Sequence, residues 1–323
     1  METVRCDLCG ADEPEILFEC RDRWFNLPGR FSMCRCRVCN LMYLNPRPER
    51  SEIGIYYPPT YALYLPAIED EPSAWQRLNR RYALAKRIRL VRTAAGDHGT
   101  ALDVGCATGI FLNALRHIGW NVCGVEIDGQ AAAYARSRFG LSVFHGELIE
   151  AAFAEQQFDL ITMWDVLEHV HQPRATLLEA ARITRPGGKL ILSLPNPEGL
   201  EARLFGPLWA GWDCPRHLYM FTISVLRHML AITGWRVEQV TGQSARMWLL
   251  LQSIRYWLEV NTKQSWIRAL IGSIVSNEMV RAACIPYFAL VEKLGISSGL
   301  VVIAKRDNSI HNWDCRNGTN WQV

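Results

Sequence analysis

The feature that most constrains the fold is a regular alternation of short apolar runs and helical patterns between residue 100 and about residue 240. The apolar runs have the length of buried strands, and helically spaced segments separate them. Strands that alternate with helices form βαβ units, which place the strands in one parallel sheet. After a hydrophobic, mostly helical stretch at roughly 247–294, the run GLVVIAKR (299–306) predicts one further strand. We therefore predict an α/β fold built on a large sheet.

The first apolar run, LDVGCATGIFL (102–112), predicts a buried strand that breaks into a glycine-rich turn before a helix. Small residues there let the backbone approach a ligand and direct its amides at it. The second strand ends at Glu126, 23 residues beyond Asp103, where a carboxylate can accept hydrogen bonds from ribose hydroxyls. Binding of a dinucleotide such as NAD is an alternative, but the spacing here is G-x-A-x-G and not G-x-G-x-x-G.

Four motifs in order resemble the class I S-adenosylmethionine-dependent methyltransferases over roughly residues 98–240. They are DVGCATG, the acidic Glu126, FDLITMWDVLEHV and RITRPGGKLILSLPN. The resemblance implies a Rossmann-like, seven-stranded sheet whose final strand is reversed, and GLVVIAKR suits that strand. The resemblance also implies that S-adenosylmethionine is the cofactor. Its methionine part would lie near Asp103 and the turn, Glu126 would hold its ribose, and Glu147 would reach its adenine amine. The implied cofactor-binding set is Asp103, Gly105, Cys106, Ala107, Thr108, Gly109, Glu126, Ile127, Glu147, Trp164 and Asp165. Ala107 stands where the family more commonly has glycine, and Glu147 where it more often has aspartate.

The N-terminal block contains two C-x2-C pairs, each followed by a residue type that tolerates a left-handed backbone, Gly10 or Asn40. Four thiolates in this spacing suit a tetrahedral Zn²⁺ ion with every position filled by protein, so the metal is expected to be structural. The predicted ligands are Cys6, Cys9, Cys36 and Cys39. Cys20 and Cys34 are left over as small apolar residues.

The zinc-ribbon-like module is electrically neutral, with eight arginines, no lysine and eight acidic residues in residues 1–50. A neutral module binds phosphate poorly, which disfavours nucleic acid as the substrate. A zinc-module RNA methyltransferase is therefore the second hypothesis for the function. The arrangement resembles bacterial methyltransferases that act on sugars or related small molecules. We expect O- or C-methylation of a small-molecule or sugar-type acceptor, and a non-catalytic scaffold with this fold is the third reading.

Acceptor residues are expected in the loops after the fourth and fifth strands, because ligands of α/β sheets lie beyond the carboxyl ends of the strands. The stretch GWDCPRHLYMFT (211–222) places His217 there, before a helix that starts near Thr222. We expect His217 to be the general base, with Asp213 orienting it and Trp212 and Tyr219 stacking on the acceptor.

The segment MWDVLEHVHQP (163–173) supplies two further histidines, and His169 is a second candidate base, ahead of His171. The competing interpretation is that each histidine is bonded to backbone in an aromatic-packed loop. Tyr56, Tyr57 and Tyr61 form either a lid or the packing of a Pro-rich linker.

Residues 77–92 hold seven basic side chains and no acid, with Leu84, Ile88 and Val91 on one face, which predicts an amphipathic helix with a cationic side. That side is either solvated or attracted to an anionic acceptor or membrane surface. The hydrophobic insertion at 244–298 packs on the core, forms a homodimer contact or touches a bilayer, in that order of expectation. Its longest charge-free runs are nine and ten residues, too short to span.

The start METVRCDLCG has no apolar run, and the clustered cysteines are not spaced as a disulfide framework, so we expect a cytoplasmic protein, with contact at the inner membrane surface as the alternative. The expected organisation is a zinc-binding module (1–50), a linker with the basic cap helix (51–97), the cofactor-binding core (98–243), the insertion (244–298), the last core strand (299–306) and a loose tail (307–323).

Overall fold

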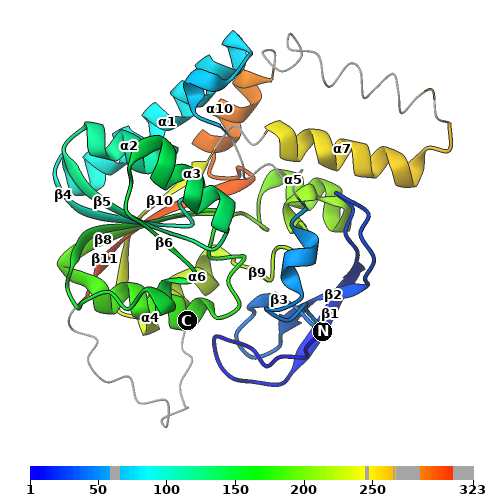
Figure 1. The fold of residues 1–323 in the computed structure, drawn as a ribbon. Helices are drawn as coiled ribbons and strands as arrows, with labels where there is room; N and C mark the ends of the chain where they lie inside the picture. The colour runs from blue at the N-terminus through cyan, green and yellow to red at the C-terminus, as the bar shows by residue number, and fades with distance from the viewer. Residues whose placement is uncertain (59–65, 244–246, 265, 267–283, 308–323) are drawn as a thin grey trace.

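The computed structural model of the protein describes residues 1–58, 66–243, 247–264, 266 and 284–307. Its largest element is a seven-stranded sheet in the order β6-β5-β4-β7-β8-β11-β10 (Figure 1). The strand β11 runs antiparallel to both of its neighbours, while the pairs among β4 to β8 are parallel. The strands are β4 (Gly99–Val104), β5 (Trp120–Glu126), β6 (Val143–His145), β7 (Phe158–Trp164), β8 (Thr184–Pro195), β10 (Trp235–Gln243) and β11 (Gly299–Arg306). The predicted α/β sheet with a reversed last strand is confirmed.

Helices cover both faces of this sheet because its central strands are apolar on both sides. One face packs on α1 (Ala74–Ala95) and α2 (Ile110–His117), and the other on α4 (Pro173–Ile183) and α6 (Ile223–Ile232), as Figure 1 shows. Successive residues of one strand therefore enter different cores: Ala101 packs with the first pair of helices and Leu102 with the second. A further helix, α3 (Gly129–Phe139), packs beside β6.

The N-terminal residues form a second, four-stranded sheet, and its last strand comes from the segment between β8 and β10 of the larger domain. Strands β1 (Pro14–Cys20), β2 (Phe31–Cys36) and β3 (Met42–Leu44) are antiparallel, and β3 pairs with β9 (Tyr219–Met220). The sequence pattern predicts a loop over residues 211–222, whereas two of these residues form β9. The next helix begins as expected, with the Thr222 side chain accepting from the Val225 amide.

The predicted basic helix is α1, and its apolar face packs as expected: Val91 is buried, and Leu84 and Ile88 pack beside it. Several of its cations have partners within the protein. Arg80 pairs with Glu71, and Lys86 pairs with Glu292. Part of the cationic side is therefore used to attach α1 to neighbouring segments.

The described parts of the insertion are α7 (Met247–Asn261) and α10 (Ile285–Lys293). Helix α7 lies against the loop that follows β8: the Ser253 hydroxyl accepts from the Ala210 amide at 2.9 Å, and Leu249 is buried there. Among the described residues no helix is both long and apolar enough to cross a bilayer. Tyr61, the middle of the insertion (267–283) and the tail beyond residue 307 lie outside the described residues.

Candidate active site

The glycine-rich turn lies at the carboxyl end of β4, where the backbone folds back tightly before α2. The amides of Gly105 and Cys106 both donate to the Val125 carbonyl, at 2.8 and 3.1 Å. Gly105 has a φ of +70°, and a Cβ there would lie 2.5 Å from Cγ2 of Val166. Ala107 adopts a left-handed φ of +47°, a conformation that glycine takes at lower cost. The turn thus leaves room for a ligand only on its outer side.

Two buried carboxylates flank this turn, at the ends of β4 and β5. Asp103 accepts a 2.6 Å hydrogen bond from the Thr162 hydroxyl, and burial raises the pKa of Asp103 to about 7. Glu126 accepts 2.8 Å bonds from the amides of Ala107 and Asp128, and burial likewise raises the pKa of Glu126. The two carboxylates predicted to bind the cofactor therefore lie together at the turn, with Glu126 also holding the turn in place.

Two further predicted cofactor residues lie at the ends of β5 and β6. Ile127 exposes 65% of its side chain, although it is apolar, next to the Glu126 carboxylate. Glu147 forms a 2.6 Å ion pair with Arg50 of the N-terminal module, a partner that sequence analysis did not identify. Desolvation raises the pKa of Glu147. These residues offer an apolar surface and a third carboxylate on the same edge of the sheet.

The end of β7 supplies Trp164 and Asp165. The Trp164 ring packs edge-on against Phe111, with the Arg87 guanidinium 4.6 Å from its centre. Asp165 has a left-handed φ of +59° and accepts a 2.8 Å bond from the Ser193 hydroxyl. We call the turn, Asp103 and the side chains just described at the ends of β5, β6 and β7 the cofactor half of the site.

The hydrogen-bond acceptors of the cofactor half fit S-adenosylmethionine better than they fit a dinucleotide. Ribose hydroxyls and an exocyclic amine are donors that carboxylates accept well, and a sulfonium compound has no pyrophosphate to bind. Asp103, Glu126 and Glu147 are three such acceptors, and the glycine that a dinucleotide turn adds is missing here.

The segment after β7 and the loop after β8 meet at two histidines, which were separate candidates in the sequence. The rings of His169 and His217 are 4.6 Å apart between centroids, in an edge-to-face arrangement. The His217 Nδ1 lies 2.8 Å from the Gly211 carbonyl oxygen, and the His169 Nδ1 lies 3.0 Å from that of Arg216. Desolvation, followed by the nearby charge of His217, lowers the pKa of His169 to about 3. We call His169, His217 and the loop 196–222 the acceptor half.

Asp213 is held by a buried arginine that sequence analysis overlooked. Arg216 donates to Asp213 at 2.6 Å and to Asp22 of the N-terminal module at 2.9 Å. Although burial alone raises it, the Arg216 charge brings the pKa of Asp213 below its ordinary value. The expected orienting contact at the His217 Nδ1 comes from the Gly211 carbonyl, because the Asp213 carboxylate is engaged by Arg216.

The aromatic residues expected to stack on an acceptor are buried inside the protein. Trp212 donates to the Gly206 carbonyl and packs against Phe18 of β1, and Tyr219 receives a 2.8 Å bond from Arg47. They join the loop to the N-terminal module. By contrast, the Tyr57 hydroxyl, expected at a lid, lies 2.9 Å from the His169 Nδ1.

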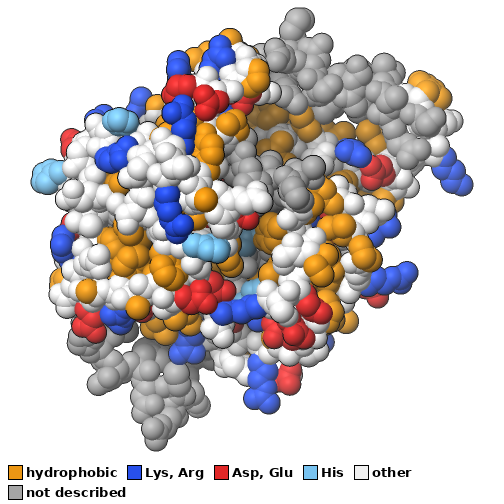
Figure 2. All heavy atoms as spheres, in the orientation of Figure 1, with side chains coloured by type: hydrophobic (Ala, Val, Ile, Leu, Met, Phe, Trp, Pro, Cys, Tyr) orange, Lys and Arg blue, Asp and Glu red, His pale blue; other side chains and the backbone are white. Residues whose placement is uncertain are grey.

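Tyr56 is buried and bonds to the Pro28 carbonyl, and His171 bonds to that of Pro48, so both serve packing. In the view of Figure 2, the surface is hollowed between the part of the molecule that holds the large sheet and the part that holds the N-terminal module.

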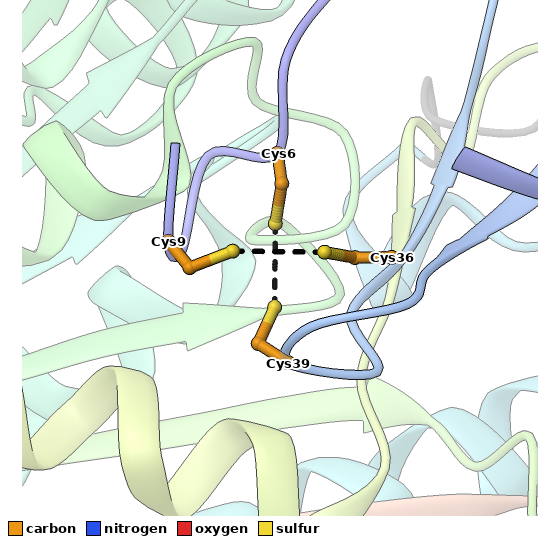
Figure 3. A group of neighbouring side chains, drawn as sticks. All are labelled: Cys6, Cys9, Cys36 and Cys39. Atoms are coloured by element: carbon orange, nitrogen blue, oxygen red, sulfur yellow. Dashed lines mark hydrogen bonds between the residues drawn. The ribbon is translucent and has the colours of Figure 1, made fainter. Parts of the chain in front are cut away.

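The four predicted metal-ligating cysteines converge from the two C-x2-C pairs (Figure 3). Their sulfur atoms lie 3.3 Å apart for Cys6 and Cys39 and 3.6 Å apart for Cys9 and Cys36. Gly10 and Asn40 have the expected left-handed backbone, with φ of +74° and +64°. Ligands about 2.3 Å from a tetrahedral Zn²⁺ ion lie roughly 3.8 Å apart, so the four thiols fit that ion with little movement.

Comparison with known proteins gives relatives for the central part of the chain. Residues 75–240, just over half of the chain, match the family model described as a methyltransferase domain. A ubiquinone biosynthesis O-methyltransferase of Pseudomonas paraeruginosa is 33% identical over 131 residues, which are 38% of this chain and 56% of the relative. A probable S-adenosylmethionine-dependent methyltransferase of Mycolicibacterium smegmatis is 26% identical over 155 residues, 48% of this chain and 58% of the relative. The chain thus spans little more than half the length of these curated relatives.

Among solved structures, a putative sarcosine dimethylglycine methyltransferase from Galdieria sulphuraria has a TM-score of 0.49 and 13% identity, covering 76% of this chain and 93% of that one. The match that places this protein is the family model, because it spans β4, β5, β6, β7 and β8 together with the turn and carboxylates of the cofactor half. The chain belongs to the methyltransferase-domain family.

Proposed function

We propose that the protein transfers a methyl group from S-adenosylmethionine to a small-molecule or sugar-type acceptor, at an oxygen or carbon atom. One observation carries this proposal: the turn with its two buried carboxylates lies on the same edge of the sheet as the paired histidines. Ligands of α/β sheets bind at that edge. The relatives named O-methyltransferases favour an oxygen acceptor.

In this proposal the cofactor half binds and orients S-adenosylmethionine, which supplies an electrophilic methyl group on its sulfonium sulfur. Asp103 and the amides of the turn hold the methionine part, and Glu126 accepts from the ribose. Ile127 packs on the adenine, and Glu147 accepts from the adenine amine once its contact with Arg50 rearranges. The turn, packed against Val166, keeps water from the inner side of the sulfonium.

The acceptor half aligns the acceptor and takes its proton. A carbonyl oxygen only accepts, so the Gly211 carbonyl fixes the His217 proton on Nδ1 and leaves the Nε2 lone pair for the acceptor. His169 stays neutral beside it because burial lowers its pKa. Asp213 acts through Arg216, since this ion pair holds the loop that carries His217.

We further propose that Cys6, Cys9, Cys36 and Cys39 hold a structural Zn²⁺ ion. The four sulfurs leave no open position for a reacting water, so the ion has no part in methyl transfer. Its role is to fix residues 1–50, whose strand β3 pairs with β9 of the acceptor half. Each remaining segment of the expected organisation then has its own part in the protein. They are the linker with the cap helix (51–97), the cofactor-binding core (98–243), the insertion with its helices over the acceptor loop (244–298), the last strand (299–306) and the tail (307–323).

The test has two parts, binding and transfer. Calorimetry with S-adenosylmethionine is expected to show one site per chain, and Asp103→Ala should abolish it. Labelled methyl groups from the cofactor should enter the metabolite fraction of a cell extract. Label in RNA would establish the RNA methyltransferase in place of this proposal, and binding without any transfer would establish a scaffold.

The His217→Gln variant tests the base. We expect it to bind the cofactor like the unchanged protein and to lose turnover by roughly 10²- to 10⁴-fold, the usual contribution of a general base. His117→Gln, at an exposed position on α2, is the matched control. Normal turnover by His217→Gln would remove this residue from the mechanism.

A further inference from the structure

Three potential metal ligands converge in the acceptor half, apart from the four cysteines. Glu168, His169 and His217 each place one ligand atom within 4.8 Å of the other two. They come from the segment after β7 and the loop after β8. Glu168 and His217 are buried, with 1% and 8% of their surface exposed.

Backbone carbonyls orient both imidazole rings as metal-binding histidines are oriented. His169 directs Nδ1 at the Arg216 carbonyl, and His217 directs Nδ1 at the Gly211 carbonyl. Because a carbonyl oxygen only accepts, we assign the proton of each ring to Nδ1 and the lone pair to Nε2, and the Tyr57 hydroxyl, 2.9 Å from the His169 Nδ1, is then a second acceptor of that proton. An Nδ1–H group bonded to a carbonyl is the usual outer contact of a histidine ligated through Nε2.

The charges around the cluster also suit a cation. Arg216, whose carbonyl oxygen lies beside the His169 ring, is buried and forms ion pairs with Asp22 and Asp213 at 2.9 and 2.6 Å. The charge of Arg216 is therefore balanced by carboxylates and does not oppose a cation at the cluster. Two imidazoles and one carboxylate form a ligand set that Zn²⁺ and its neighbours accept, with a fourth position left open.

We propose that Glu168, His169 and His217 bind one divalent cation of the Zn²⁺, Co²⁺ and Ni²⁺ class, and that this cation inhibits methyl transfer. Inhibition rests on the proposed function, because the metal occupies the Nε2 lone pair that His217 uses as a base. Binding itself does not rest on it. Metal–ligand distances of about 2.0–2.2 Å require the three side chains to move slightly inward from their positions in the structure.

The experiment titrates Co²⁺ into the untagged, full-length protein whose four-cysteine site has been filled with Zn²⁺. We expect one Co²⁺ per chain, with visible d–d absorption and no sulfur-to-cobalt charge-transfer band. Glu168→Gln and His217→Ala should each weaken Co²⁺ binding at least about tenfold, while His117→Ala should not change it. Unchanged zinc content and calorimetric binding of S-adenosylhomocysteine show that each variant is folded.

A sulfur-to-cobalt band as the sole signal, or equal Co²⁺ affinity in the His217→Ala variant, would overturn the site. In the transfer assay, Co²⁺ should reduce turnover over the concentration range in which it binds. Stimulation by Co²⁺ would overturn the inhibitory role. If Co²⁺ binds as expected but no acceptor is ever methylated, the proposed function fails and the metal site stands, so the two failures are distinguishable.

Discussion

The cofactor half and the acceptor half of the site differ in how far apart in the sequence their contacting residues lie. In the cofactor half most of the polar contacts described above join neighbouring strands of one sheet, such as Glu126 to the Ala107 amide, and the Glu147–Arg50 ion pair is the exception. In the acceptor half they also join segments far apart in the sequence, such as Asp22 and Arg216, which are separated by strands β4 to β8. The difference implies that the first half survives damage to the N-terminal module and that the second does not.

Cys39→Ser removes a proposed zinc ligand and should show the largest difference between the two halves of the site. Structural zinc in small modules contributes on the order of 10 kcal/mol, so the sheet of β1, β2 and β3 should unfold and release β9. We expect turnover to fall by more than about 100-fold, as for a lost general base, because the loop carrying His217 loses its support, while cofactor binding persists. Zinc content, transfer and calorimetry measure the three effects.

The matched control for this experiment is Cys284→Ser, a half-buried cysteine before α10 that is no part of the four-cysteine group. It should retain zinc and turnover. Full turnover by zinc-free Cys39→Ser would show that the acceptor half does not depend on the module.

Arg216→Met tests the ion pairs that join the acceptor half to the N-terminal module. Removing one partner leaves the buried carboxylates of Asp22 and Asp213 uncompensated, and we expect the free energy of unfolding to fall by about 3–5 kcal/mol. Urea denaturation measures the change, and Arg203→Met, at an exposed position on α5, is the control. Adding Asp22→Asn and Asp213→Asn to Arg216→Met should recover part of the loss, and failure to recover would argue against buried charge as its cause.

Asp103→Asn tests the raised pKa of a carboxyl group in the cofactor half. The measured quantity is the dependence of the unfolding free energy on pH. The folded-state pKa of about 7 lies above the unfolded value near 4, so the folded protein binds the proton more tightly. The stability that Asp103 contributes is therefore complete below about pH 4 and is lost as pH rises through 7. We expect the unfolding free energy of the unchanged protein to decline from pH 5 to 8 by a few kcal/mol more than that of Asp103→Asn. Parallel urea profiles of the two proteins would contradict the raised pKa.

Ala107→Gly should give the smallest effect, and a favourable one. Glycine adopts the left-handed φ of +47° without the steric cost that a Cβ imposes, which is worth roughly 1 kcal/mol. The gain is smaller than that cost because glycine also loses more entropy on folding. Ala133→Gly, at an exposed position inside α3, should lose stability by about 1 kcal/mol under the same urea denaturation. A loss at position 107 as well would mean that this turn tolerates the Ala107 side chain without strain.

The cofactor half was predictable because its determinants are local. Apolar runs defined the strands, Gly105 and Gly109 defined the turn, and the seven-stranded sheet with its reversed last strand followed from the resemblance. The edge on which His217 lies followed from the rule that ligands bind beyond the carboxyl ends of the strands. That the loops after β7 and β8 meet, through the contact of His217 with His169, is seen only in the structure.

The parts that sequence analysis missed depend on partners distant in the chain. Arg216 lies within the quoted stretch 211–222, but its significance comes from Asp22, and nothing in the local pattern connects the two. Trp212 and Tyr219 were expected to contact an acceptor because aromatic residues near a base suggest a binding surface. They are buried instead, because the N-terminal module packs on that loop. The two residues of β9 are too few for any periodicity to reveal.

The strand β9 also sets an order of events during synthesis of the chain. Residues 219 and 220 leave the ribosome about 175 residues after β3, which at roughly 5–20 residues per second is a delay of about 9–35 s. During that interval β3 is an open strand edge, a kind of surface that other chains can pair with. The N-terminal sheet is thus translated first but is completed only after strands β4 to β8 of the large sheet have been made, so chaperones that bind nascent chains are expected to act on its open edge.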